Sequence, residues 1–123
     1  MNELFSIEAE VTFIPKAEGW RETIPTLSGC VYRPHIVLGD PNQRQAIIDG
    51  NEIKETYLGV AFKSSLSNVE FNKPCIAEIV FIYYPQQAIY DSLVANATFT
   101  IREGARIVGF GRVKRLPNQK PQS

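Results

Sequence analysis

The chain has 123 residues, of which 44% are hydrophobic and 21% charged, so it is long enough for one domain with a buried core and too apolar for general disorder. Its thirteen basic and thirteen acidic residues cancel, which excludes a chain-wide attraction to nucleic acid and leaves only local attraction. The first ten residues lack the charge pattern of a signal peptide, and no run approaches the ~20 apolar residues of a membrane span, so we expect a cytoplasmic protein.

Short runs of β-branched and aromatic residues recur between Gly, Pro, Asn and Asp, a pattern that predicts an all-β protein. The first run alternates apolar and polar residues, as a strand with one buried face does. The expected strands span residues 5–14, 31–38, 45–53, 57–62, 75–84, 97–102 and 106–115. We therefore predict a single antiparallel β-barrel of six or seven strands over residues 1–116, followed by a flexible tail at 117–123 that holds no apolar side chain.

Two segments depart from simple alternation. Residues 75–84 (CIAEIVFIYY) are apolar on both parities apart from Glu78, which predicts a central strand covered on both sides. Residues 86–96 (QQAIYDSLVAN) place Ala88, Ile89 and Leu93 at helical spacing, which predicts either a short helix or a loop with one turn.

The stretch 99–113 (FTIREGARIVGFGRV) has two apolar runs around Glu103-Gly104 and predicts a tight hairpin, because glycine accepts the backbone of a sharp turn. It is not a phosphate loop, since Lys114 stands where the dinucleotide fingerprint needs its third glycine. Gly109 and Gly111 instead indicate strong coiling of a strand or a close approach of two backbones.

Positive charge gathers along this hairpin, in Arg102, Arg106, Arg112, Lys114 and Arg115. Two interpretations stay open. The cations can contact the phosphates of a nucleic acid, or they can keep an edge strand from pairing with another chain.

Little in the sequence indicates catalysis. His35 is the only histidine, which leaves no partner histidine for a multi-histidine metal site. Cys30 would face the other side of a strand shared with His35, and we expect Cys30 and Cys75 to be free, buried thiols. We therefore predict no enzyme activity, no metal and no cofactor.

Several polar or aromatic residues outside the hairpin are candidates for partner contacts. Trp20 stands among charged residues, where an exposed indole can anchor a protein contact. Arg21 and Arg33 can hold a phosphate or carboxylate through the guanidinium fork, or can form salt bridges that fix loops. Stacking of Trp20, Tyr32 or the pair Tyr83-Tyr84 on nucleic-acid bases is a further option, and packing of these rings in the core or at its rim is the alternative.

The pattern from Glu8 to Arg115 resembles the C-terminal β-barrel domain, the third domain, of bacterial elongation factor Tu. The matching segments occur in the family's order: EAEVTFIPKAEGWRET, GCVYRPHIVL and FTIREGARIVGFGRV. Trp20 replaces the second glycine of the family's E-G-G-R, and His35 replaces the glutamine of its G-Y-R-P-Q. Residues 50–73 match poorly, and the chain has no G-x-x-x-x-G-K-[ST] loop, so no nucleotide cofactor and no GTPase activity are expected.

The resemblance implies a stand-alone, non-catalytic barrel that binds a macromolecule. In the family this barrel contacts the backbone of tRNA, the nucleotide-binding domain of the same chain and the exchange factor. The partner-binding residues implied here are Trp20, Arg21, Arg33, His35, Arg102, Glu103, Gly104 and Arg106. Because the net charge is balanced, we favour a protein partner, in one version a toxin for which the chain acts as a decoy or immunity protein. Binding of tRNA-like RNA is the alternative, and no membrane contact is expected.

Overall fold

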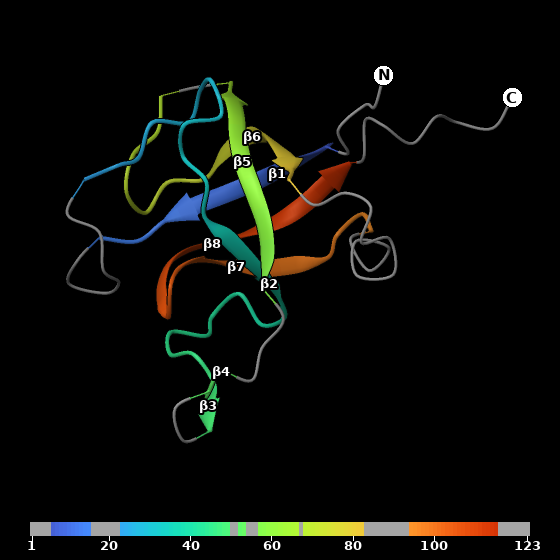
Figure 1. Cartoon of the computed structure of the whole chain (residues 1–123). Helices are drawn as coiled ribbons and strands as arrows, with labels where there is room; N and C mark the ends of the chain where they lie inside the picture. The colour runs from blue at the N-terminus through green and yellow to red at the C-terminus, as the bar shows by residue number, and fades with distance from the viewer. Residues whose placement is uncertain are drawn as a thin grey trace, which may run out of the picture.

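The computed structural model describes residues 6–15, 23–49, 52–53, 57–66, 68–82 and 94–115, and shows an all-β protein (Figure 1). Six antiparallel strands close a barrel in the order β1-β6-β5-β2-β7-β8, and β8 pairs with β1. The strands are β1 (Ser6–Phe13), β2 (His35–Leu38), β5 (Leu58–Ser65), β6 (Cys75–Phe81), β7 (Thr98–Glu103) and β8 (Arg106–Arg115). The predicted single antiparallel barrel is confirmed.

The segment between β2 and β5 leaves the barrel and carries a separate two-stranded sheet. The expected strand at 45–53 is replaced there by β3 (Ile48–Asp49) and β4 (Glu52–Ile53), which pair with each other and with no barrel strand (Figure 1). A hydrophobic pattern alone does not distinguish one strand from a short hairpin of the same composition.

The predicted strand 31–38 is regular only from His35, because Pro34 has no N–H to give to a ladder. The preceding residues still run beside β5. The Phe62 amide donates to the Tyr32 carbonyl at 3.0 Å, and the Val60 amide donates to the Pro34 carbonyl at 3.1 Å. The pairing with β5 therefore continues through residues 32–34, which precede β2, although this segment is not a regular strand.

Every second residue of β1 enters the core, as its alternation predicts. Ile7, Ala9, Val11 and Phe13 are fully buried, together with inward residues of the other five strands. Bulges on β5 and β8 shift the register and increase the coiling that closes so small a barrel. At one of them, Ile101 pairs with Gly109 and Arg102 with Ile107, which leaves Val108 as the extra residue.

Two glycines of β8 allow this strand to pack closely against both β1 and β7. A Cβ on Gly109 would lie 2.6 Å from the Thr12 carbonyl oxygen, and one on Gly111 would lie 2.7 Å from both the Glu10 carbonyl oxygen and the Phe99 ring. The predicted close backbone approach is thus present. Gly111 makes room for Phe99, and Gly109 makes room for the backbone of β1.

Two expectations about the strands need correction. β6 is covered on its inner face, but Ile76 and Glu78 on its outer face are only half-buried. In a closed barrel every strand has two neighbours, so no strand is central. For the same reason β8 is not an edge strand, so its charges do not protect an edge. The candidate helix at 86–96 falls largely, and the tail at 117–123 wholly, outside the described residues.

Candidate binding surface at the barrel mouth

An aromatic cluster closes one end of the barrel, which we call the mouth. The ring of Tyr32 lies 6.1 Å from that of Phe13 and 5.5 Å from that of Phe62, measured between centroids. The end of β1 and the turn between β7 and β8 lie on this same side of the barrel (Figure 1). Because its ring packs against the core, Tyr32 is only partly exposed, which leaves less of the ring for stacking on a base.

The Tyr32 hydroxyl joins two segments that are distant in the sequence. It donates a hydrogen bond of 2.6 Å to Oε2 of Glu103, 71 residues away. Glu103 ends β7, so this bond ties the loop before β2 to the tip of the β7–β8 hairpin. A bond from a phenol to a charged carboxylate is stronger than one between neutral groups.

The predicted hairpin at Glu103-Gly104 is confirmed. Glu103 and Arg106 face each other as Cα partners, and Gly104 and Ala105 form the two-residue turn between them. Gly104 has a φ of 64°, which a residue with a Cβ adopts only with strain. Nothing lies within 4 Å of where its Cβ would be, so the turn presents open backbone.

The loop before β2 is held by backbone hydrogen bonds in an uncommon conformation. Gly29 and Cys30 have φ values of 69° and 59°, and their amides donate to the carbonyls of Lys63 and Phe62. Nε of Arg33 donates to the Cys30 carbonyl at 2.9 Å. These bonds offset a cost of about 1–2 kcal/mol for a positive φ at Cys30.

This loop exposes one apolar and one cationic side chain. Val31 is 69% exposed, and Arg33 is also exposed. Both alternate with Tyr32, so they point to the other side of the extended segment. His35 follows on the same parity, half-buried, with its ring 5.6 Å from that of Tyr57.

The structure places Arg102 differently from the partner-facing position implied by the resemblance. Its side chain is fully buried on the outer face of β7, beneath the segment that leaves the barrel after β2. Nε donates to the Thr100 hydroxyl at 2.8 Å, Nη1 donates to the Tyr57 hydroxyl at 3.0 Å, and the guanidinium lies 5.4 Å from the Tyr57 ring centroid. Arg102 therefore anchors that segment, and a partner cannot reach it.

The remaining predicted residues fall into two groups. Glu103, Gly104 and Arg106 lie at the hairpin tip beside the mouth, whereas Arg33 and His35 share the parity of the outer face, where His35 is the Cα partner of Arg102. Arg106 is exposed. Trp20, Arg21 and the pair Tyr83-Tyr84 lie outside the residues that the structure describes.

Two arginines on β8 away from the mouth have acidic neighbours. Arg115 donates to Glu8 at 3.0 Å, and Arg112 lies 3.7 Å from Glu10. Exposed pairs of this kind contribute little to stability, but they reduce the positive charge offered to a polyanion. They count against phosphate binding by Arg112 and Arg115, which is one of the two interpretations of the hairpin cations.

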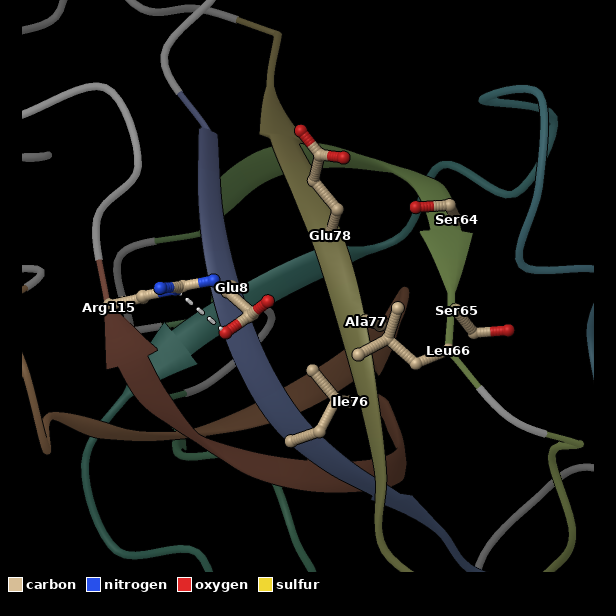
Figure 2. Close-up of a pocket in the computed structure, with 8 residues that line it drawn as sticks. All are labelled: Glu8, Ser64, Ser65, Leu66, Ile76, Ala77, Glu78 and Arg115. Carbon is tan, nitrogen blue, oxygen red and sulfur yellow. Dashed lines mark hydrogen bonds and ion pairs between the residues drawn. The ribbon is translucent and has the colours of Figure 1, made fainter.

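A shallow pocket of about 220 Å³ lies on the outer face of β1 and β6, away from the mouth (Figure 2). Glu8 and Glu78 are Cα partners across these strands, and Figure 2 shows Glu8 turned toward Arg115. Glu78 lies 3.8 Å from Lys63. Each carboxylate therefore has its own cation, an arrangement typical of a charged outer face.

The thiols occupy different environments. Both cysteines are free; Cys30 is half-buried in the loop before β2, while Cys75 is buried in β6. Burial raises the pKa of the Cys75 thiol. The prediction of two buried thiols thus holds fully only for Cys75.

Among the described ranges, no three or more His, Cys, Asp or Glu side chains are placed to share a metal ion. Within the same part of the chain, no helix has the length and apolar character needed to cross a membrane.

Comparisons of the sequence with protein-family models and with curated proteins find no match. The resemblance to the elongation factor Tu barrel remains a prediction from the three motifs. The residues that sequence reasoning missed are Tyr57 as the partner of Arg102 and Tyr32 as the partner of Glu103. Each pair joins distant segments, and no local spacing signals it.

Proposed function

We propose that the protein is a non-catalytic binding module that recognises a protein partner through its barrel mouth. The supporting observation is that the Tyr32–Glu103 hydrogen bond joins the loop that carries Arg33 to the hairpin tip that carries Glu103, Gly104 and Arg106, although two separate motifs supply these residues. An open glycine turn beside exposed arginines offers both backbone and charged groups to a partner. The Tyr32–Glu103 hydrogen bond fixes the loop before β2 relative to the hairpin tip before a partner binds, which lowers the entropic cost of association.

A protein partner is favoured over RNA. RNA binding needs several cations free to neutralise phosphates and aromatic faces on which bases stack. Here Arg112 and Arg115 lie against carboxylates, Arg102 is buried, and the Tyr32 ring packs in the core. The motif resemblance adds one specific version, a decoy or immunity protein that presents an elongation-factor-like surface to a toxin.

The test uses a photo-reactive amino acid placed at two exposed positions of the purified chain. Ala105 lies in the mouth turn, and Lys114 lies on the same strand pair away from it. After incubation with native lysate and illumination, we expect the Ala105 variant to trap a discrete protein and the Lys114 variant not to do so. Equal trapping at both positions, or trapping of RNA at Ala105, would contradict the proposal.

A further inference from the structure

The loop before β2 carries an irregularity of pairing at Val31. The Phe62 amide donates to the Tyr32 carbonyl, and the Phe62 carbonyl accepts the Cys30 amide, both at 3.0 Å. The residues on either side of Val31 thus bond to one residue of β5, which makes Val31 the extra residue of a bulge. Such a bulge re-aims a side chain, and that of Val31 is 69% exposed.

This exposure is fixed at a conformational cost. Cys30, directly before Val31, has a φ of 59°, which a residue with a Cβ adopts only with strain. Backbone hydrogen bonds to β5 hold the amides of Gly29 and Cys30, and Nε of Arg33 holds the Cys30 carbonyl. Backbone strain that the surroundings maintain is concentrated at binding and catalytic sites. A side chain on such a fixed backbone loses less entropy when a partner covers it.

Arg33 adds a cation to the same outer face. The Val60 amide donates to the Pro34 carbonyl, which continues the β2–β5 register and places Arg33 opposite Ala61. Because Ala61 is short, β5 places no bulky side chain beside the guanidinium. Nε already donates to the Cys30 carbonyl, so the edge of the guanidinium that remains for a carboxylate is the one formed by its two Nη groups.

We infer that Val31 and Arg33 together bind an extended segment of the protein partner, in which an apolar residue and an Asp or Glu stand two positions apart. Val31 and Arg33 are themselves two residues apart on an extended segment, about 7 Å. Residues at the same interval in an extended peptide share one face and this spacing, and a carboxylate complements the charge and the fork of Arg33. The inference rests on the proposed function and assigns the chemistry that the partner presents to the loop before β2.

The probe is the capped peptide Gly-Ser-Leu-Ser-Glu-Ser-Gly, titrated into the ¹⁵N-labelled full chain. One control peptide has Gln in place of Glu, and the other has Glu directly after Leu. We expect amide shifts confined to residues 29–35 and the facing residues 59–63, with binding that weakens as salt is raised. Both controls should bind about threefold more weakly or worse. Equal binding of either control, or shifts spread over the barrel, would overturn the inference.

Variants of the chain test the two contacts separately. Val31→Ser and Arg33→Gln should each weaken binding of the probe about threefold or more. Val94 is 54% exposed before β7, and Arg112 is exposed on β8, so Val94→Ser and Arg112→Gln are matched controls away from the loop. They should leave the affinity unchanged. Equal weakening by the controls would overturn the inference.

A reversal of charge separates a contact with the ligand from mere support of the loop. Arg33→Glu loses the bond to Cys30 but offers a carboxylate in place of the guanidinium. This variant should prefer a peptide with Lys in place of Glu, by about threefold. If the variant binds both peptides equally weakly, or neither, the contact assigned to Arg33 is wrong.

Other occupants of this surface give distinct results. Shifts at residues 29–35 that grow with protein concentration alone would show a second copy of the chain there. The same shifts on addition of a short RNA, reversed by salt, would show RNA binding. Either result would overturn the inference.

The two proposals fail in different ways. If Ala105 traps a protein but the probe does not bind at residues 29–35, only the chemistry assigned to the loop is wrong. If the probe binds there but Ala105 traps nothing, the proposed recognition through the mouth is wrong.

Discussion

The stem and the tip of the β7–β8 hairpin come from one continuous motif but have opposite properties. In the stem, Phe99 and Ile101 fill the core, Gly111 leaves room for Phe99, and Arg102 is buried on the outer face. At the tip, Gly104 and Ala105 are exposed. A run of charged and glycine residues can thus be buried at one position and exposed a few positions later, depending on which segments pack against it.

The largest difference between stem and tip should appear on removal of an arginine. Arg102→Ala leaves the hydroxyls of Thr100 and Tyr57 without their buried partner and opens a cavity, so we expect a loss of about 3 kcal/mol in the free energy of unfolding. Arg106→Ala at the exposed tip should change it by less than about 0.5 kcal/mol. Urea denaturation of both variants gives the comparison, and equal losses would remove the distinction.

Glycine substitution should give the next largest contrast. Gly111→Ala puts a Cβ 2.7 Å from both a backbone carbonyl and the Phe99 ring, and should cost about 2–3 kcal/mol. Gly104→Ala meets no atom but must keep a φ of 64°, which costs about 1–2 kcal/mol. Thermal denaturation ranks the two variants. A smaller loss of stability for Gly111→Ala than for Gly104→Ala would contradict the close packing of β8 against β1 and β7.

Removing the Tyr32 hydroxyl should have a smaller effect on stability. Tyr32→Phe keeps the contacts with Phe13 and Phe62 and loses one hydrogen bond to a carboxylate, worth about 1–2 kcal/mol. Hydrogen exchange should show faster opening at the tip than in the stem. Unchanged exchange at residues 103–106 would show that the bond does not order the tip.

The smallest effect is a pH dependence set by Cys75. Burial holds its pKa above that of the unfolded thiol, so the unfolded chain ionises first as the pH rises above about 8.5. The unfolded state is then favoured, and stability should fall with rising pH in this window. Cys75→Ala should flatten that slope, measured by denaturation between pH 7 and 10, and an unchanged slope would contradict the assignment.

Most of the fold could be predicted from local sequence patterns. The alternation of β1, the glycine turn and the strand composition of β8 each reflect side-chain direction or backbone freedom, which neighbouring residues determine. The two-stranded sheet between β2 and β5 could not be predicted in the same way, because the short β3–β4 pair has the composition of a longer strand.

The sequence indicated which residues could belong to the candidate site, but not how these residues contact one another. Gly104 follows from its turn, whereas the burial of Arg102 depends on Tyr57, 45 residues earlier. The role of Glu103 depends likewise on Tyr32. Such contacts are set by how the barrel closes, which no spacing in the sequence reports.

The central claim, that the mouth recognises a protein, is tested most directly by hydrogen–deuterium exchange of the chain alone and bound to the partner trapped at Ala105. We predict that protection on binding is confined to residues 28–35 and 103–107. Protection on the outer face of β1 and β6 around Glu8 and Glu78, with the mouth unchanged, would contradict it.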